Sequence, residues 1–144
     1  MIAFTIRRAP PSWSNRRGHW STEYKAKRDW RELAWFGAAS ARVLCSDLSM
    51  RLVPDARAAP EKRAVTIIVH RCQLLDHDNL VASVKPILDG LKGQIIVDDS
   101  PRWLELSVRQ VKAPRRALER TEIEVTRCAG SQVDSRATQQ QSAV

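Results

Sequence analysis

The sequence predicts a single-domain α+β fold in which a mixed β-sheet carries two main helices. Three observations support this prediction. The length of 144 residues suits one domain. Stretches of alternating and β-branched residues, which favour strands, are separated by two stretches with helical periodicity. The predicted order, β-α-β-α-β-β-β, fits helices packed on one sheet.

The first half of the chain contains a strand, an irregular loop and the longer helix. Residues 2–8 alternate in character and include β-branched side chains, which favours a strand. Residues 10–15 are rich in Pro and Ser, which favours a turn-rich loop. Ser21 is expected to cap a helix over residues 22–42. The apolar positions of this helix recur at intervals of three and four and predict one buried stripe of Ala26, Trp30, Leu33, Ala34, Gly37, Ala38 and Ala41.

The second half contains the clearest strand and the second helix. Residues 65–71, with the sequence VTIIVHR, form that strand, and a short helical region after them ends at Gly90–Gly93. Pro86 leaves two paths open: a helix from Asn79 would be kinked by the proline, whereas a helix capped by Ser83 would hold it in the first turn. The other predicted elements are a loop or weak edge element over 47–63, a short strand over 94–97, and an antiparallel pair of strands over 103–111 and 119–127.

The chain as a whole has the properties of a cytoplasmic protein. No stretch approaches the roughly 20 apolar residues of a membrane span, so no membrane partner is expected, and the first residues turn polar too early for a signal peptide. The three cysteines are widely spaced and are expected to be reduced, without a zinc site. Residues 129–144 contain too few apolar side chains to pack, which predicts a disordered tail after a folded domain of residues 1–128.

A formal net charge of +8 suits a polyanionic partner such as DNA. Many of the basic side chains fall in the first 31 residues, where Trp13, Trp20, Tyr24 and Trp30 lie between them. Aromatic rings can stack on exposed bases, although Trp30 is expected to pack in the core. The alternative for the basic set is a solvated helix face. The side chains predicted to contact DNA are Arg16, Arg17, Lys27 and Arg28, with Lys112, Arg115 and Arg116 as the next candidates.

Aspartates are concentrated between residues 76 and 99 of this basic chain, and they suggest a metal site. Asp76 and Asp78 follow the strand at 65–71, and residues two apart in an extended segment face the same side. Asp98 and Asp99 end the next predicted strand, where one of them can turn toward the same edge. Converging carboxylates repel each other unless a cation joins them. Mg²⁺ prefers carboxylate and water oxygens, and beside a phosphodiester it can activate water for hydrolysis.

Structural explanations exist for the same residues. Asp78 or Asn79 could serve only as a helix N-cap, and Asp98–Ser100 could be only a turn. Lys85 and Asp89 are spaced i, i+4 and therefore share a helix face. A lysine near the carboxylates could contact the scissile phosphate or the leaving oxygen, or it could form an ordinary exposed ion pair that contributes little stability.

These residues also form a spaced pattern. Asp76-His-Asp-Asn79 has the form D-x-D-N, and it is followed by Lys85, by Asp89 four residues later, by a glycine turn and by the pair Asp98-Asp99. The pattern resembles that of the RusA family of phage-borne Holliday junction resolvases. The resemblance implies a RusA-like fold and a homodimeric, Mg²⁺-dependent endonuclease that cuts branched DNA, with Mn²⁺ able to replace Mg²⁺.

The resemblance spans most of residues 4–126, because Pro10-Pro11-Ser12 and Asn15 also look like the family's early loop. It implies a role for each matching position. The catalytic and metal-binding carboxylates match Asp76, Asp78 and Asp99, the functional lysine matches Lys85, and the possible supporting residues are Asn79, Asp89 and Asp98.

One departure from the family pattern concerns the lysine. Five residues separate Asn79 from Lys85, where the family's best-known form has two. Three extra residues add nearly one helical turn and move Lys85 about 4.5 Å farther along the axis. Two alternatives to junction cleavage therefore stay open: a nuclease for flaps or forks, and a catalytically weak or inactive protein that binds branched DNA. A homodimer would match the approximate two-fold symmetry of a four-way junction.

Overall fold

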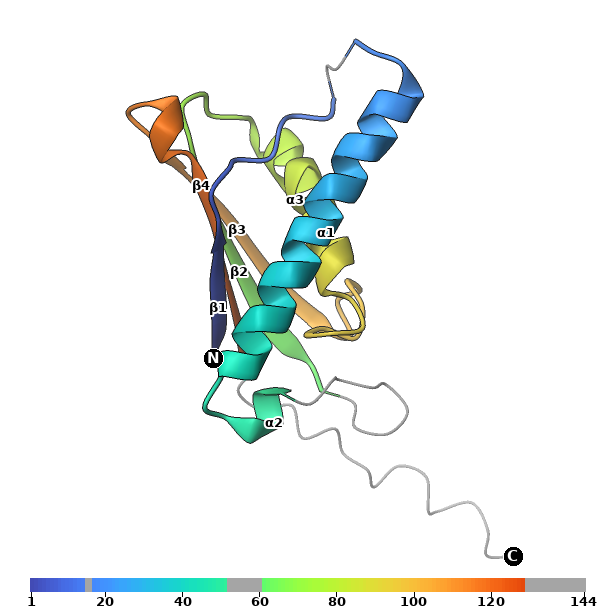
Figure 1. The fold of residues 1–144 in the computed structure, drawn as a ribbon, viewed down its shortest axis with the longest axis vertical. Coiled ribbons are helices and arrows are strands. Elements are labelled where there is room, and N and C mark those ends of the chain that lie inside the picture. Colours follow the sequence, from blue (N-terminus) through green and yellow to red (C-terminus); the bar gives the residue numbers. More distant parts are fainter. Residues whose placement is uncertain (15–16, 52–60, 129–144) are drawn as a thin grey trace, which may run out of the picture.

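A four-stranded sheet with helices on one face makes up the fold of this chain (Figure 1). The computed structural model describes residues 1–14, 17–51 and 61–128, so the predicted tail at 129–144 lies outside the described residues. The single-domain α+β class with a mixed sheet is confirmed. The elements are β1 (Ile2–Ile6), α1 (Trp20–Leu44), α2 (Leu48–Arg51), β2 (Arg63–Arg71), α3 (His77–Leu91), β3 (Leu104–Lys112), a 3-10 turn η1 (Arg116–Leu118) and β4 (Arg120–Arg127).

The strand order is β1-β4-β2-β3, which corrects the predicted pairing of the last two strands. β3 runs parallel to β2, whereas β4 lies between β1 and β2 and is antiparallel to both. β2 takes an inner position because Val65, Ile67 and Val69 are fully buried on the helix-covered face. β3 suits an edge because charged residues such as Glu105 and Arg109 stay exposed on its other face.

The predicted strand over 94–97 is wrong, and the predicted order is therefore not matched. This segment is a turn in which the backbone N–H groups of residues 94–96 donate to the carbonyl oxygen of Leu91. Ile95 and Ile96 are fully buried, and a short apolar run of this kind looks the same in sequence whether it forms a strand or a buried turn. Gly93 permits the turn, since its φ is +74°.

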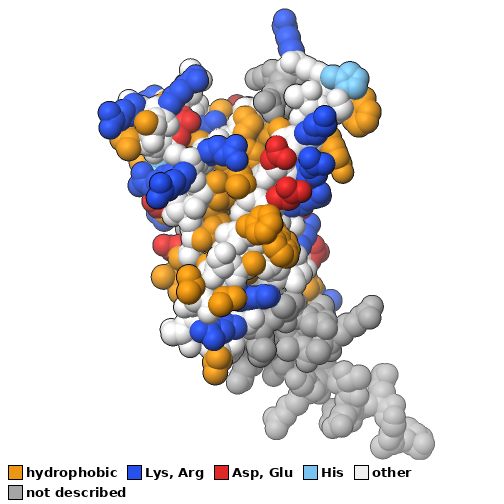
Figure 2. Space-filling view, in the orientation of Figure 1, with side chains coloured by type: hydrophobic (Ala, Val, Ile, Leu, Met, Phe, Trp, Pro, Cys, Tyr) orange, Lys and Arg blue, Asp and Glu red, His pale blue; other side chains and the backbone are white. Residues whose placement is uncertain are grey.

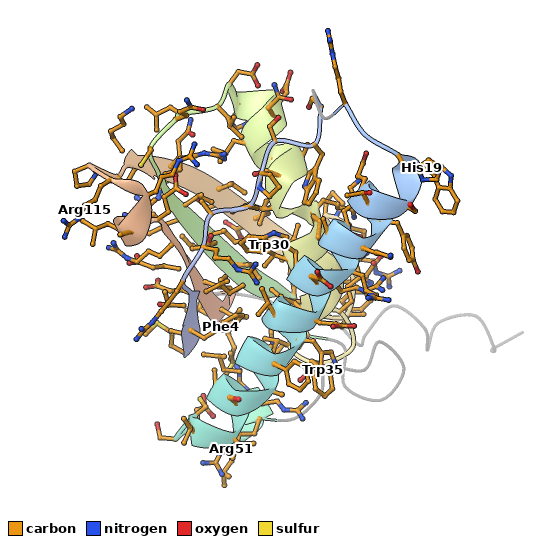
Figure 3. All side chains as sticks on the ribbon, turned by 45° about the horizontal axis from the view of Figure 1, so that its top comes forward. Phe4, His19, Trp30, Trp35, Arg51 and Arg115 are labelled. Carbon is orange, nitrogen blue, oxygen red and sulfur yellow. The ribbon has the colours of Figure 1, made fainter. Side chains whose placement is uncertain are left out.

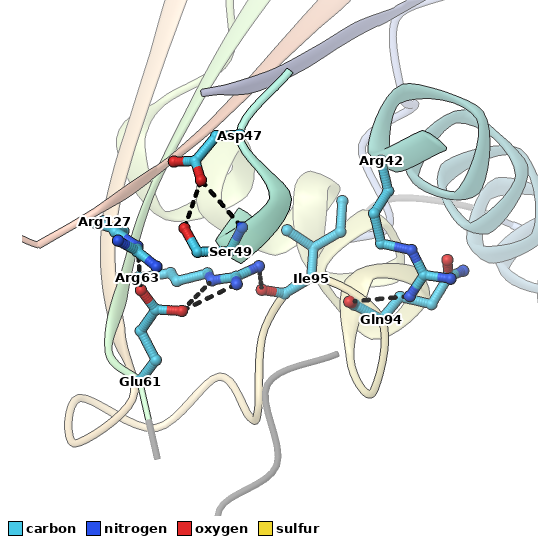
Figure 4. A network of polar contacts seen from close by, with 8 residues as sticks. All are labelled: Arg42, Asp47, Ser49, Glu61, Arg63, Gln94, Ile95 and Arg127. Carbon is cyan, nitrogen blue, oxygen red and sulfur yellow. Dashed lines mark hydrogen bonds and ion pairs between the residues drawn. The ribbon is translucent and has the colours of Figure 1, made fainter. Parts of the chain in front are cut away.

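A fully buried arginine fixes this turn to the start of β2 (Figure 4). The Nη1 atom of Arg63 donates to the carbonyl oxygen of Ile95 at 2.7 Å, and its Nε and Nη2 atoms donate to Glu61 at 3.2 and 2.9 Å. Glu61 also pairs with Arg127 at 2.6 Å. A buried charge of this kind needs several partners to offset its desolvation, and here those partners hold the segment before Asp98–Asp99 in place.

Helix α1 begins earlier and ends later than predicted, and His19 rather than Ser21 is its N-cap. The imidazole of His19 accepts from the backbone N–H of Ser21 at 3.3 Å. The predicted buried stripe is confirmed at its centre, where Trp30, Ala34 and Ala38 are buried. Figure 3 shows Trp30 pointing toward the sheet and Trp35 pointing away from it.

Helix α3 packs against α1 on the same face of the sheet. Of the two paths predicted for this helix, the one with Pro86 in the helix interior is confirmed and the one capped by Ser83 is wrong. The helix begins at His77 rather than at Asn79, its N-cap is Asp76, and Pro86 is buried inside it. A proline there leaves one carbonyl of the preceding turn without its helical donor. Gly90 allows the close crossing, since a Cβ at this position would overlap the backbone carbonyl oxygen of Arg31.

No helix in the described ranges is long and apolar enough to span a membrane. Cys45 is buried, whereas Cys72 and Cys128 are partly exposed, and all three are free thiols. Burial raises the pKa of the Cys72 thiol, and the neighbouring carboxylate of Glu119 raises it further.

Candidate functional site

The predicted site residues lie along α3 and in the turn before β3, where they form two groups. One group is at the N-terminal end of the helix, and the other is at its C-terminal half. Asp89 is eleven positions after Asp78, which corresponds to about 16 Å along the helix axis. The N-terminal group consists of Asp76, Asp78 and Asn79; the C-terminal group consists of Lys85, Asp89, Asp98 and Asp99, together with Lys92.

The N-terminal group is organised by the helix cap. Oδ1 of Asp76 accepts from the backbone N–H of Asn79 at 2.9 Å, and its Oδ2 accepts from the side-chain amide of Asn79 at 3.0 Å. Capping satisfies one of the free N–H groups of the first turn, and the helix dipole favours a carboxylate there. Asp78 is exposed in the same turn, and it forms no salt bridge with a described residue. Its carboxylate is therefore open to solvent.

The C-terminal group is an ion-pair network. The Nζ atom of Lys85 contacts Asp99 and lies 3.7 Å from Asp89. The Nζ atom of Lys92 lies 3.1 Å from Asp89, 3.0 Å from Asp99 and 3.7 Å from Asp98. Three carboxylates thus share two ammonium groups. Because the Lys85 side chain is 52% exposed, each pair contributes at most about 1 kcal/mol to stability, and solvent or a phosphate can compete for the ammonium groups.

The three aspartates predicted to bind Mg²⁺ do not meet at one point. Asp76 and Asp78 belong to the N-terminal group, whereas Asp99 is held by Lys85 and Lys92 in the C-terminal group. Within the described parts of the chain, no three His, Cys, Asp or Glu side chains are arranged to hold a metal ion. Mg²⁺ requires its oxygen ligands at about 2.0–2.1 Å, so this arrangement does not fit one ion shared by all three. The requirement for Mg²⁺ stays a prediction.

Two of the four predicted DNA contacts lie beside the C-terminal group. Lys27 and Arg28 of α1 line a hollow whose other wall carries Lys85 and Asp89 of α3. Figure 2 shows basic side chains along the upper, N-terminal half of α1, with acidic side chains among them. Arg17 is exposed just before α1, and Arg16 lies outside the described residues.

The acidic side chains within α1 restrain this basic face only weakly. Lys27 pairs with Glu23 at 2.6 Å, and Arg28 lies 3.8 Å from Glu32 and 4.0 Å from Asp29. Exposed pairs within a helix contribute roughly 0.3–0.5 kcal/mol each. Such pairs can therefore be exchanged for contacts with a phosphate at little cost.

The early loop joins α1 to α3 near the N-terminal group. The indole Nε1 of Trp13 donates to the carbonyl oxygen of Ser83 at 3.2 Å, and the Lys27 ammonium lies 5.4 Å from the centre of the Trp13 ring. The hydroxyl of Ser14 donates to the side-chain oxygen of Asn79. The loop, the D-x-D-N segment and the basic helix, which are far apart in sequence, are thus in contact.

A buried charge lies at the end of β2, five residues before Asp76. Arg71 is only 8% exposed, and its Nε and Nη1 atoms have no hydrogen-bond partner among the residues that the structure describes. Burial lowers the pKa of Arg71, while the carboxylate of Glu119 opposes that shift. Glu119 in turn accepts from the backbone N–H of Cys72 at 2.9 Å, which anchors the segment that leads to Asp76.

Lys92 is the site residue that sequence reasoning missed. It contacts three of the predicted aspartates, more than any other basic residue in the described chain. Its spacing was a usable signal, because Lys85, Asp89 and Lys92 follow each other at i, i+4 and i+7, on one helix face.

Comparisons of the chain with protein-family models, with curated proteins and with solved structures find no match. The grounds for assigning a function are therefore the geometry and chemistry of this site and the resemblance in the sequence.

Proposed function

We propose that this chain is a structure-specific endodeoxyribonuclease of the RusA type, which depends on Mg²⁺ and cuts branched DNA such as four-way junctions. One observation carries the proposal. The early loop, the D-x-D-N segment, the lysine with its aspartates and the basic face of α1 are separated in sequence, yet they occupy one continuous region of α1, α3 and the adjoining loops. Helix capping and surface charge do not require these four segments to lie together, whereas a shared functional site does.

The basic side chains supply the affinity for DNA in this proposal. Lys27, Arg28 and Arg17 are exposed and can neutralise backbone phosphates, which releases counterions. Such contacts hold the DNA without reading its sequence. Branch selectivity then comes from the spacing of two sites in a homodimer, since paired cuts in a two-fold symmetric junction need two sites related in the same way.

Lys85 has the most direct role among the residues that can meet the reacting phosphate. Its ammonium group lies between Asp99 and Asp89 at the edge of the hollow. If this ammonium group pairs with a phosphate oxygen in place of one carboxylate, it can stabilise the charge that develops during bond cleavage. Despite the insertion before it, Lys85 therefore contacts Asp99 and lies close to Asp89.

A second candidate is a protein that binds branched DNA with weak or no cleavage. It is favoured by the separation of Asp76 and Asp78 from Asp99 and by the two ammonium groups that already neutralise Asp99. Either candidate would act on DNA through the same basic face. A preference for flaps or forks over four-way junctions is a variant of the first candidate.

Cleavage and binding assays with the full chain separate the two candidates. Labelled four-way, forked, flapped and linear DNA would be incubated with Mg²⁺, with Mn²⁺ and with EDTA. The nuclease proposal expects metal-dependent cuts in the branched DNA and none in the linear duplex. Tight branched-DNA binding without cuts would replace it with the second candidate, and equal binding to linear and branched DNA would contradict both.

A further inference from the structure

The hollow between α1 and α3 has the features of a binding site for part of a DNA strand. Its volume is about 250 Å³, below the 300–1,000 Å³ of most small-molecule pockets. It lies directly beside the C-terminal group, because Lys85 and Asp89 belong to both. A space of this size can accept one flat ring system and opens to the surface on which the DNA is proposed to lie.

We propose that this hollow binds one unpaired nucleotide of the DNA, so that the favoured substrates carry an unpaired base at or near the branch. This inference rests on the proposed action on DNA and names the form of DNA that the site selects. Fully paired duplex arms present phosphates on their surface but no free base face. A hollow with an aromatic wall is therefore useful only for a nucleotide whose base is out of the stack.

The charge of the walls suits the sugar–phosphate part of a nucleotide. Lys27, Arg28 and Arg31 from α1 and Lys85 from α3 face one carboxylate, that of Asp89. Arg31 is exposed, and no salt bridge to it is found among the described residues. Phosphate contacts by such groups are sequence-independent, as a site for a nucleotide beside a variable branch requires.

An exposed ring supplies the wall on which the base can stack. The side chain of Tyr24 lines the hollow and is 59% exposed. Trp20, one turn earlier, is 74% exposed, and Trp35 is one turn after Arg31 and is also exposed. Spacings of four, seven and four residues put these side chains on one side of α1. Aromatic rings alternating with cations are typical of surfaces that bind unpaired strands.

A neighbouring side of α1 provides a control. Phe36 is 63% exposed, similar to Tyr24, but it lines a different hollow between α1 and β1. Its ring contacts Trp35 edge to face, with 5.1 Å between the ring centroids, and neither of these rings lines the hollow beside Lys85. Removing either ring takes away a comparable exposed aromatic group from the same helix. Only the ring of Tyr24 lies beside Lys85, so only its removal should alter the response to unpaired DNA.

The test uses the full-length protein in EDTA and two forked DNAs that differ only in one arm. In one DNA this arm is unpaired and carries 2-aminopurine next to the branch; in the other it is annealed to its complement. Wild type should bind the unpaired form at least about fivefold more tightly, since one base–aromatic stack contributes about 1–3 kcal/mol, and should quench the 2-aminopurine. Tyr24→Ala should lose both the preference and the quenching, whereas Tyr24→Phe and Phe36→Ala should retain them.

Two results would overturn the proposal: a wild-type protein without preference for the unpaired arm, or a folded Tyr24→Ala variant that keeps the preference and the quenching. Circular dichroism checks the fold of each variant, and Arg31→Gln gives a second, independent reduction of the same preference. Cleavage of a fully paired four-way junction is measured in parallel. A protein that cuts this junction but ignores the unpaired arm retains the proposed function and loses this inference; a protein that binds no DNA loses both.

Discussion

The two ends of helix α3 hold carboxylates by different means. At the N-terminal end, Asp76 is stabilised by backbone and side-chain N–H groups, and Asp78 is left open to solvent. At the C-terminal half, the ammonium groups of Lys85 and Lys92 neutralise the aspartates. A cation arriving from solution meets the carboxylate of Asp78, which is paired with no described residue, at the first end and carboxylates already paired with ammonium groups at the second.

This difference separates metal binding from DNA contact, which the sequence pattern places in one site. The N-terminal end can attract a cation through the exposed carboxylate of Asp78, which has no salt bridge to a described residue, while the positive end of the helix dipole offsets part of that negative charge. The C-terminal end has partly exposed ammonium groups beside the basic face of α1, and these groups can pair with phosphates in place of the carboxylates. We therefore expect metal binding to depend most on the first end, and contact with DNA phosphates, including the contact proposed for Lys85, to depend most on the second.

The largest expected effect is on cleavage by Asp78→Asn. Asparagine keeps the size of the side chain and removes its charge, so cleavage of branched DNA should fall by more than about 100-fold, the upper figure for loss of a supporting partner in a metal site. Binding should persist or tighten, because phosphates meet less negative charge. Labelled-junction cleavage and gel-shift titration give the two measurements.

Asp89→Asn is the matched change at the other end of α3. It should leave cleavage within about tenfold of wild type, the lower figure for a supporting partner. If Asp78→Asn cuts at the wild-type rate, Asp78 is not a catalytic residue. Equal losses in both variants would remove the distinction between the two ends.

A smaller effect is expected from the basic residues beside the C-terminal half. Replacing Arg16, Arg17, Lys27 and Arg28 together with Gln should flatten the log–log salt dependence of binding by up to about 3.6, since each neutralised phosphate contributes about 0.9. Replacing only Lys27 and Arg28, which line the hollow, should produce at least half of that change.

Affinity measured over a series of salt concentrations tests this prediction. Binding of every DNA shape should weaken, because phosphates are present in all of them and contacts with phosphates carry no sequence information. An unchanged slope in a folded quadruple variant would make the basic face a solvated helix surface. The basic residues Lys112, Arg115 and Arg116 around the turn between β3 and β4 would then be the next candidates for DNA contact.

The smallest expected effect separates the two roles of Asp76. Asp76→Ala should lower the free energy of unfolding by about 1 kcal/mol through loss of the N-cap, whereas Asp76→Asn should change it by only a few tenths, since Asn caps as well as Asp. Urea denaturation measures both values. A loss of cleavage in the stable Asn variant would indicate a role in chemistry, and full activity would leave Asp76 as a cap alone.

Sequence patterns predicted the elements with strong periodicity correctly. They failed for segments whose structure depends on contacts with residues that are distant in sequence. The stripe around Trp30 and the apolar alternation of Val65, Ile67 and Val69 identified α1 and β2, because burial on one face imposes a period that a sequence displays. The turn at Ile95 and Ile96 was mistaken for a strand, since its burial comes from packing and from the Arg63 contact rather than from pairing.

The sequence by itself determined the α+β class, the main helices and strands, and the residues of the D-x-D-N, lysine and DD pattern, because these depend on local periodicity and residue type. Only the tertiary structure decided that β2 separates β3 from β4, that Lys92 joins the aspartates, and that the basic face of α1 borders Lys85. The last of these facts depends on how α1 and α3 cross at Gly90 and Arg31. The crossing of two helices depends on how side chains that are distant in sequence pack together, so no local sequence pattern predicts it.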